Sequence, residues 1–486
     1  MAPATLTQLL EATAAVRPDA PAFGGLRWAE VARRVEAMAG GLAGLGIGPG
    51  DRVALFLPNR PDFLLLLLAL ARRGACAILL NTRFRAAELA NLLARAEPVA
   101  IAVARDFPGV DAGAILEAVP AESRAGLRCV IGADGLGAGA LAGLPVHPLD
   151  ALTGASADCA TPESPALSYT TSGTTAGPKL VLHTQRSLAT HARAVAGRIG
   201  LDAPGAAFLA VVPLCGTFGL SAALAALAGG AAIAMQERFE PHSADALIRA
   251  ARITHMVAGD ELLLKLAEAA GGRAYAPFAF TGFASFHGQG PAVLAASAAL
   301  NLAVRGVYGS SEAQALFAVQ AAGIAPGGGL PVSAEAEFRI DDEGGLHLRG
   351  PSLFAGYLGA APHQGWFATG DLAAPRADGG GFDFLTRSGD ALRLGGFLVS
   401  PEEIEVFLAL QPGVRAVQVV EDAGKAVACV IPAEDFDAAA LLRAAKSSLA
   451  GFKVPARVVT LDSFPTTDGP NGPKIQRAAL RAMARG

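Results

Sequence analysis

Charged residues, aromatic residues and cysteines are scarce in this chain of 486 residues. Only 17% of the residues are Asp, Glu, Lys or Arg and only 6% are aromatic, whereas 52% are apolar. That share of apolar side chains exceeds what one core of ordinary size needs, so we expect two or more packed units. The composition also excludes disordered, collagen-like and coiled-coil proteins.

Neither charge is in large excess. The formal net charge is −4, the sequence pI is about 6.1, and Lys and Arg are scattered along the chain rather than clustered. A protein that follows a phosphate backbone needs a basic surface. We therefore expect no nucleic-acid partner.

Cysteine pairs are lacking as well. The five cysteines are odd in number, lie far apart and form no Cys-x-x-Cys motif: Cys76, Cys129, Cys159, Cys215 and Cys429. This spacing indicates neither a disulfide framework nor a zinc site. The N-terminal residues contain no basic stretch that leads into an apolar run, so we expect a cytoplasmic protein without a secretory signal.

The apolar runs of the chain are either short or interrupted. Residues 63–71 lie between Asp62 and Arg72 and are too few to cross a bilayer. Residues 203–236 carry no charge, but prolines and glycines divide them into lengths that fit a buried strand, helix and strand. We expect no membrane span.

What the chain does contain is an alternation of helical and strand patterns. Helical patterns cover residues 6–16 and 28–45, and short apolar strands cover 53–57 and 77–80. The alternation continues through residues 200–310. It predicts an α/β fold with a largely parallel sheet.

The pattern changes twice toward the C-terminus. From about residue 325, Gly-rich short strands such as 337–340 and 346–349 predict a small β-rich unit. After Arg387, strands and helices of modest size predict a compact α+β unit. We expect an N-terminal domain at 1–388 and a C-terminal domain at 389–486.

Residues 167–179, LeuSerTyrThrThrSerGlyThrThrAlaGlyProLys, are the most informative segment. Small residues let backbone N–H groups face an anion, hydroxyl groups add donors, and Lys179 adds a positive charge. The composition alone fits both a triphosphate site and a surface loop. The phosphate loop of kinases and GTPases does not fit, because Pro178 precedes Lys179 and Leu180 follows it.

Residues 168–179 closely resemble the phosphate loop of the adenylate-forming superfamily, which comprises acyl-CoA synthetases, aryl-CoA ligases, luciferases and the adenylation domains of peptide synthetases. Further segments resemble other motifs of that superfamily. They occur in the same order along the chain as in the superfamily, and they are spread over nearly the whole chain. They are residues 50–59, TyrGlySerSerGlu at 308–312, TrpPheAlaThrGlyAsp at 366–371, Arg387 with residues 395–405, and AsnGlyProLysIleGlnArg at 471–477.

Lysine usage supports the resemblance independently. The chain has only six lysines, and two of them, Lys179 and Lys474, lie in Gly-rich loops. A lysine ammonium is a compact charge suited to a moving phosphate or carboxylate, and arginine does not replace it.

The resemblance implies an ATP-dependent carboxylate–CoA ligase. A carboxylate attacks the α-phosphate of ATP to give an acyl-adenylate and pyrophosphate, and the thiol of coenzyme A then displaces AMP. ATP, Mg²⁺ and coenzyme A are the implied substrates and cofactors. Fixed cations are needed because the carboxylate must approach a polyanion that repels it.

The resemblance also assigns roles to residues. Lys474 bridges the carboxylate and the α-phosphate, Glu312 holds Mg²⁺, and Thr175 completes the catalytic set. Tyr308 contacts adenine, and Asp371 and Arg387 bind the ribose. As isolated features, the same residues also fit a solvated lysine, surface carboxylates and a core tyrosine. The implied nucleotide-binding set is Thr171, Ser172, Gly173, Thr174, Thr175, Lys179, Tyr308, Gly309, Ser310, Ser311, Glu312, Asp371 and Arg387.

In the second step, the resemblance implies that the C-terminal domain rotates about Gly389 and Asp390. Coenzyme A then contacts Gly395, Gly396 and Phe397, where glycines allow close approach to the backbone. The hinge position usually holds Asp or Lys in this superfamily, so a side-chain role is absent at Gly389. Ala176 likewise replaces a usual glycine, although Gly177 follows it.

The acyl pocket departs furthest from the superfamily. Gly216 stands where a His or aromatic residue is common, and residues 282–286 replace a Gly-Gly-Ala-Pro-Leu-like segment. A pocket formed by Gly216, Phe218, Phe283 and Ala284 predicts an apolar acid that is fatty, alicyclic or aromatic. No charged residue there suits an amino acid.

Two other functions remain open from the sequence. One is a stand-alone adenylation enzyme that loads a carrier protein, and the other is a nucleotide-binding homologue without catalysis. The sequence also leaves a homodimer open.

Overall fold

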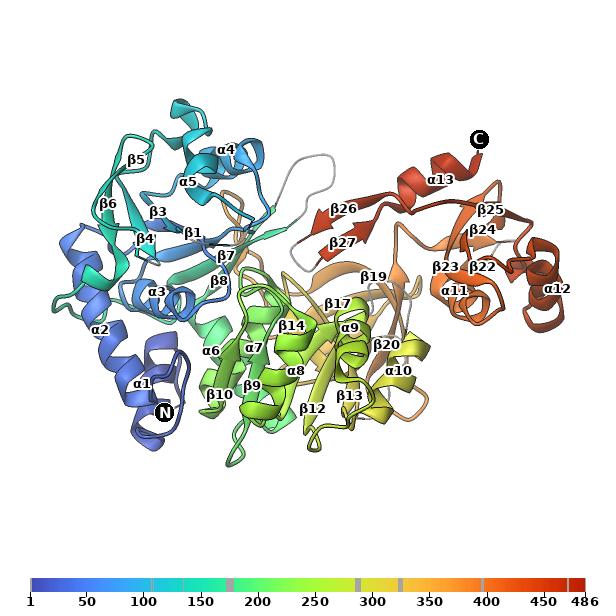
Figure 1. The fold of residues 1–486 in the computed structure, drawn as a ribbon, viewed down its shortest axis with the longest axis horizontal. Coiled ribbons are helices and arrows are strands. Elements are labelled where there is room, and N and C mark those ends of the chain that lie inside the picture. The colour runs from blue at the N-terminus through green and yellow to red at the C-terminus, as the bar shows by residue number, and fades with distance from the viewer. Residues whose placement is uncertain are drawn as a thin grey trace.

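The computed structural model describes residues 2–105, 107, 109–133, 135–171, 179–284, 290–321, 327–394, 397–469 and 472–485. At Phe397 and Lys474 the backbone alone is described. Two large sheets with their helices form the N-terminal part, and a smaller α+β part follows at the C-terminus (Figure 1).

The first sheet has nine described strands in the order β18-β8-β7-β2-β1-β3-β4-β6-β5. The centre of this sheet is parallel, and β7 and β8 form an antiparallel pair at one side. The strands are β1 (Arg52–Phe56), β2 (Cys76–Leu79), β3 (Ala100–Ala104), β4 (Cys129–Ala133), β5 (Gly139–Leu141), β6 (Leu144–Pro148), β7 (Pro165–Thr171), β8 (Lys179–Thr184) and β18 (Gly356–Tyr357). Its helices are α1 (Leu6–Val16), α2 (Trp28–Gly44), α3 (Pro61–Arg72), α4 (Ala86–Ala96) and α5 (Ala112–Glu117).

The second sheet has eleven described strands in the order β10-β9-β11-β12-β13-β14-β15-β20-β19-β17-β16. Its strands are β9 (Ala207–Ala210), β10 (Ala232–Met235), β11 (His255–Gly259), β12 (Phe280–Ala284), β13 (Val304–Ser310), β14 (Gln314–Val319), β15 (Gly328–Pro331), β16 (Glu337–Ile340), β17 (Gly345–Arg349), β19 (Phe367–Pro375) and β20 (Phe382–Arg387). Its helices are α6 (Gln185–Ile199), α7 (Thr217–Gly229), α8 (Pro241–Ala250), α9 (Asp260–Ala270) and α10 (Gly290–Ala299).

The β-rich strands after residue 325 continue this second sheet. Strand β15 pairs with β14 on one side and with β20 on the other, so backbone hydrogen bonds join the α/β region to β16, β17, β19 and β20. The sequence predicted the strands themselves but not this continuity. It arises because β15 contributes two register pairs on each of its sides.

One hydrophobic cluster joins the two sheets through α7. This helix is apolar on all sides, and its residues from Thr217 to Leu227 are buried. A helix that is apolar all round belongs inside a large core. The uncharged segment 203–236 therefore contains a strand, a helix and a strand, as predicted, of which β9 and α7 are buried. Among the described residues, no helix has both the length and the apolar character needed to cross a bilayer.

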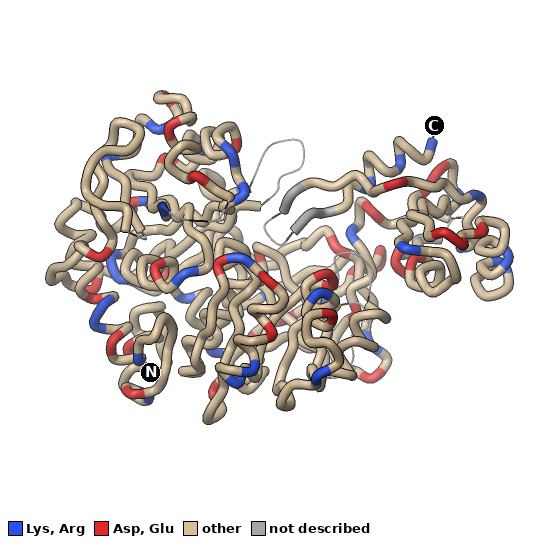
Figure 2. The backbone as a smooth tube through the Cα atoms, viewed as in Figure 1, with Lys and Arg blue, Asp and Glu red and all other residues tan. Residues whose placement is uncertain are grey.

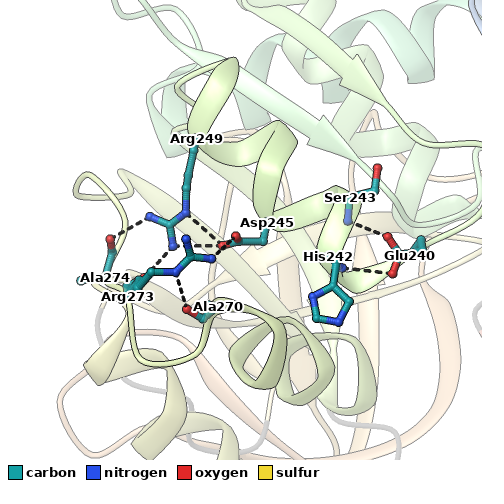
Figure 3. A network of polar contacts seen from close by, with 8 residues as sticks. All are labelled: Glu240, His242, Ser243, Asp245, Arg249, Ala270, Arg273 and Ala274. Atoms are coloured by element: carbon teal, nitrogen blue, oxygen red, sulfur yellow. Dashed lines mark hydrogen bonds and ion pairs between the residues drawn. The ribbon is translucent and has the colours of Figure 1, made fainter.

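A polar network fixes α8 to the segment that follows α9 (Figure 3). Asp245, only 5% exposed, accepts from Arg249 Nε at 3.1 Å and from Arg273 Nη2 at 2.9 Å. Burial acts to raise the pKa of Asp245, but the two arginines outweigh burial and hold it below its usual value. Arg249 also lies 4.5 Å from the ring centroid of Tyr275. At the other end of α8, the Glu240 carboxylate caps the first turn by accepting from the backbone N–H groups of His242 and Ser243 (Figure 3).

The C-terminal part has its own hydrophobic cluster, which begins at Leu392 and extends to Ala445. Its elements are β21 (Leu392–Leu394), β22 (Phe397–Val399), α11 (Pro401–Ala409), β23 (Val414–Asp422), β24 (Lys425–Pro432), α12 (Ala438–Ser448), β25 (Arg457–Thr460), β26 (Thr466–Gly469), β27 (Gly472–Ile475) and α13 (Arg477–Arg485). The hairpin β26–β27 extends from this part toward the N-terminal part (Figure 1). Acidic and basic residues occur throughout both parts of the described chain (Figure 2).

Candidate nucleotide site

The predicted phosphate loop connects β7 to β8. Thr171 and Lys179 are register partners of this antiparallel pair, so the sheet fixes the two ends of the loop beside each other. Lys179 is exposed, and its ammonium lies 4.9 Å from the ring centroid of Tyr357. Ser172, Gly173, Thr174 and Thr175 lie outside the described residues.

Residues 308–312, called the 308–312 turn below, cover the end of β13 and the start of the turn that leads to β14. The register shifts between Tyr308 and Ser310, and Gln314 then adopts a φ of +63°. Gly309 fits because a Cβ there would lie 2.3 Å from the carbonyl oxygen of Gln314. A β-bulge and a residue in the left-handed conformation both change the direction of the backbone. Both occur preferentially next to functional sites. Here Ser310 ends β13, and Ser311 and Glu312 follow it outside the strands.

Buried side chains from neighbouring elements hold this turn. His183 Nε2, on β8, donates to the carbonyl oxygen of Ser311 at 2.7 Å, and Thr217, on α7, donates to the Ser311 hydroxyl at 3.1 Å. Gln314 donates to the carbonyl oxygens of Ser187 and Ser352. Burial lowers the pKa of His183 to about 4, so the ring is neutral and Nε2 carries the proton that its carbonyl partner requires.

Among the described side chains predicted for the site, Asp371 is the most buried charged group, at 4% exposure. It lies opposite Arg387 in the β19–β20 register, with Arg387 Nε 2.9 Å from Asp371 Oδ1. The Tyr308 hydroxyl donates to Asp371 Oδ2 at 2.5 Å. Burial raises the pKa of Asp371, whereas Arg387 and Tyr308 act in the opposite direction. Burial, and then the charge of Asp371, raise the pKa of Tyr308, so its hydroxyl remains a donor.

The Tyr308 ring packs against two aromatic side chains of β20. Its centroid lies 5.2 Å from that of Phe382 in an edge-on arrangement and 5.9 Å from that of Phe384. The structure thus brings together Tyr308, Asp371 and Arg387, which lie far apart in the sequence.

Tyr357 joins the phosphate loop to the turn at 308–312. Its hydroxyl donates to Glu312 Oε1 at 3.0 Å, while its ring faces the Lys179 ammonium. Burial, and then the Glu312 carboxylate, raise the pKa of Tyr357 far above pH 7. A neutral hydroxyl therefore contacts the carboxylate without cancelling its charge.

Glu312 suits Mg²⁺ by the chemistry of its donor atoms. It is a partly exposed carboxylate with one oxygen held by Tyr357. Mg²⁺ commonly binds one or two carboxylates together with substrate phosphates and waters. Among the described residues, no group of three or more His, Cys, Asp or Glu side chains could hold a metal by itself. A single carboxylate beside a phosphate loop fits a nucleotide-bound ion.

The residues predicted for the acyl pocket separate into two groups. Gly216 precedes α7, Phe218 lies on α7, and Phe218 and Ala284 belong to the cluster between the sheets. Phe283 packs into a different cluster with residues of α9 and α10. Successive residues of a strand face opposite sides. The structure therefore brings Ala284, but not Phe283, to the side of the sheet on which Phe218 lies.

The C-terminal residues predicted for the site are described only in part. Gly389 and Asp390 follow β20 in a turn, where the N–H of Asp390 donates to the Arg387 carbonyl oxygen at 2.9 Å. Lys474 lies on β27 opposite Thr467 of β26. Phe397 begins β22, and Gly395 and Gly396 lie outside the described residues.

Sequence reasoning missed Tyr357, His183, Thr217 and Gln314. One signal was present for Tyr357, because the chain has only four tyrosines and two of them, Tyr308 and Tyr357, lie in this site. His183 and Thr217 contact Ser311 of the 308–312 turn, and Gln314 donates to Ser187 and Ser352. These are contacts between distant segments, which no local pattern reveals.

The family model described as AMP-binding enzyme matches residues 10–358. The chain belongs to this family. Its sequence is 31% identical to that of 3-[(3aS,4S,7aS)-7a-methyl-1,5-dioxo-octahydro-1H-inden-4-yl]propanoyl:CoA ligase of Mycobacterium tuberculosis, over 93% of each chain. It is 28% identical to 2-succinylbenzoate–CoA ligase of Listeria monocytogenes, again over 93% of each chain.

A solved structure shares the fold of this AMP-binding enzyme. It is O-succinylbenzoate coenzyme A synthetase from Bacillus subtilis, in complex with ATP and magnesium ion. The TM-score is 0.78 with 21% identity, over 98% of this chain and 99% of that one. The predicted α/β fold and the predicted relationship to adenylate-forming ligases are confirmed.

Proposed function

We propose that this AMP-binding enzyme is an ATP-dependent ligase that joins an apolar carboxylic acid to coenzyme A through an acyl-adenylate. The observation that carries the proposal is the convergence of three motifs. Tyr308 joins the 308–312 turn to the Asp371–Arg387 pair, and Tyr357 joins Glu312 to Lys179. An ammonium, a carboxylate and a buried aspartate are thereby linked in one nucleotide site.

Each side chain has a role in the proposed first step. Lys179 and the hydroxyl groups of the phosphate loop, Thr171 and Thr175 included, bind the β- and γ-phosphates. Asp371 and Arg387 bind the ribose, and Tyr308 borders the adenine. Glu312 would hold Mg²⁺, which supplies charge neutralisation on the phosphates. A carboxylate oxygen of the acid bonds to the α-phosphorus, and the bond from that phosphorus to pyrophosphate breaks.

Lys474 is proposed to reach the α-phosphate and the acid from the opposite side. The β26–β27 hairpin that bears it extends toward the N-terminal part (Figure 1). A lysine there lowers the repulsion between two anions as they approach. In the second step the C-terminal domain, residues 389–486, rotates about Gly389 and Asp390 and presents residues 395–397 to coenzyme A. The thiolate sulfur then bonds to the acyl carbon, and AMP leaves.

The proposed acyl pocket lies beside α7. Gly216, Phe218 and Ala284 offer small and apolar surfaces, and Phe218 is 5% exposed. Charged groups in the acid would be desolvated there without a partner, which is costly. The substrate class is therefore fatty, alicyclic or aromatic. The relatives named for a 7a-methyl-dioxo-indenyl propanoate and for 2-succinylbenzoate support a bulky acid with a ring system. A cytoplasmic location remains part of the proposal.

Pyrophosphate exchange tests the proposal directly. A panel of fatty, alicyclic and aromatic acids, with amino acids as the comparison, is assayed for acid-dependent exchange of labelled pyrophosphate into ATP. We expect exchange with at least one apolar acid and AMP release when coenzyme A is added. Stronger exchange with free amino acids would overturn the proposed substrate class. Transfer to a phosphopantetheinylated carrier protein but not to coenzyme A would instead identify a carrier-loading enzyme.

A further inference from the structure

The segment 354–358 is bonded both to the strand that begins at Lys179 and to the residue proposed to hold the metal. The N–H of Leu358 donates to the carbonyl oxygen of Leu180 at 2.9 Å, and β18 pairs with β8 so that Tyr357 lies opposite Val181. At the other end, the N–H of Phe354 donates to the carbonyl oxygen of Glu312 at 2.8 Å. The backbone of this segment therefore connects β8, which begins at Lys179, to Glu312.

Tyr357 makes the same connection through its side chain. We propose that Tyr357 is a positioning residue, whose hydroxyl fixes the Glu312 carboxylate and whose ring fixes the Lys179 ammonium for the phosphates of ATP. The hydroxyl lies 3.0 Å from Glu312 Oε1, and the ring centroid lies 4.9 Å from Lys179 Nζ. The Phe354 ring packs edge-on against the Tyr357 ring at 5.1 Å and limits its rotation.

The two contacts suit a tyrosine better than a charged residue. A hydroxyl donates one hydrogen bond to Oε1 and leaves the negative charge and the second oxygen, Oε2, available to a cation. The ring attracts an ammonium through its quadrupole without neutralising it. In the described structure Lys179 and Glu312 form no ion pair with each other, although both contact Tyr357. Each charge is thereby kept for the nucleotide.

Tyr357→Phe and Tyr357→Leu separate the two contacts. The Phe variant keeps the ring and removes the hydroxyl, whereas the Leu variant removes both. The measurement is the equilibrium dissociation constant of ATP, with and without Mg²⁺, by competition against a fluorescent ATP analogue. The matched control is Tyr275→Phe, because Tyr275 lies beside Arg249 in the α8 network.

For Tyr357→Phe we expect the Mg²⁺-dependent gain in ATP affinity to fall at least about tenfold, the scale of one hydrogen bond to a charged group. Affinity without Mg²⁺ should stay within about twofold of wild type. Tyr357→Leu should further weaken Mg²⁺-free binding about threefold, the scale of one exposed cation–π contact. Tyr275→Phe should change neither constant.

Double variants show whether the effects of the Tyr357 substitutions depend on Glu312 and on Lys179. In a Glu312→Gln background, replacing Tyr357 with Phe should no longer change the Mg²⁺-dependent gain. In a Lys179→Ala background, the difference between the Phe and Leu variants should vanish. Effects that persist unchanged in these backgrounds, or a Tyr357→Phe variant that matches Tyr275→Phe, would overturn the role of Tyr357.

This inference rests on the proposed function, but its test uses neither acid nor coenzyme A. Coupled binding effects without any acid-dependent exchange would sustain the role of Tyr357 and reject the ligase. Acid-dependent exchange in the wild type without coupled binding effects would sustain the ligase and reject the role of Tyr357. Absence of ATP binding by the wild type would overturn both. If Tyr357→Leu does not fold by circular dichroism, the Phe variant and its Glu312→Gln double variant decide the matter.

Discussion

Asp371 and Arg387 face each other on adjacent antiparallel strands, with Arg387 Nε 2.9 Å from Asp371 Oδ1. Opposed residues in such a pair have Cβ atoms about 5 Å apart, so the strand register itself produces the contact. The same aspartate accepts from Tyr308. A buried carboxylate is thus fixed from two sides, with an orientation set before any nucleotide arrives.

Asp371→Asn should weaken adenylate formation because it removes the charge that Arg387 and Tyr308 orient. We expect the kcat/KM for ATP in pyrophosphate exchange to fall about 10- to 100-fold, the scale of a lost charge-assisted hydrogen bond. Asp383→Asn is the matched control, because Asp383 also lies on this strand pair but contacts Arg376. Equal losses in both variants would indicate damage to the sheet rather than to the site.

Lys474→Ala should separate the two proposed half-reactions. Removing the ammonium should depress pyrophosphate exchange by at least about 100-fold, because one fixed charge at a developing transition state is worth several kcal/mol. Thioester formation from supplied acyl-adenylate and coenzyme A should change by less than about threefold. Lys265→Ala, which removes an exposed ion pair with Glu261, serves as the control. Similar losses in both half-reactions would contradict the proposed rotation of the C-terminal domain.

His183 should make stability depend on pH. Burial lowers its pKa to about 4, below the value of 6.5 for a free histidine, so the unfolded chain binds more protons between these values. The contribution of His183 to stability is therefore fully present above about pH 6.5 and is lost as the pH decreases toward 4. His191, on α6, has the same shift and the same cause and contributes in the same direction.

The variant His183→Gln should weaken the dependence of stability on pH, because it removes the titrating side chain at this position. A glutamine can still donate to the Ser311 carbonyl oxygen, whereas His183→Ala leaves it without this donor at a cost of about 1 to 3 kcal/mol. Urea unfolding at several pH values between about 4.5 and 7.5 measures both effects. Wild-type and His183→Gln proteins with equal pH slopes would show that His183 becomes protonated without cost.

Glu402, on α11, should destabilise the protein at high pH. Burial raises its pKa to about 7, and the charges of Glu405 and of Asp260 on α9 add to the shift while Arg477 on α13 opposes it. Glu402 is then protonated to a greater extent in the folded than in the unfolded state between about pH 4.5 and 7, so its contribution to stability falls as the pH rises through this window.

Glu402→Gln should therefore raise the melting temperature at pH 8 and leave it nearly unchanged at pH 5. Glu402 is partly exposed, so we expect a gain on the order of 1 kcal/mol after solvent screening. The exposed Glu434→Gln variant is the control. A gain of the same size at both pH values would refute the electrostatic cause.

Much of the fold follows from local patterns. The helical pattern at 6–16 became α1 with the same bounds, and the strand pattern at 337–340 became β16. The run at 203–236 formed a strand, a helix and a strand because glycines and a proline break its apolar sequence. The β-rich region was predicted as a small unit of the N-terminal domain, and its continuity with the second sheet was not predicted, because strand pairing between distant segments leaves no local trace.

The candidate site was predicted less completely. Glu312 and Asp371 were found because the segments 308–312 and 366–371 resemble motifs of the adenylate-forming superfamily. Tyr357 and His183 were missed, because each acts on a residue more than forty positions away, and the contact depends on which strands become neighbours.

By itself, the sequence determined the strands, the helices and the residue types that a nucleotide demands, because apolar periodicity and small, hydroxyl and basic side chains are local properties. Only the tertiary structure decided which of those residues meet. Sheet order placed β18 beside β8 and β19 beside β20, so Tyr357 reaches Glu312 and Arg387 reaches Asp371. Burial, which also arises only on folding, then shifted the pKa values of His183 and Asp371 in opposite directions, because removal from water penalises the charged form of each.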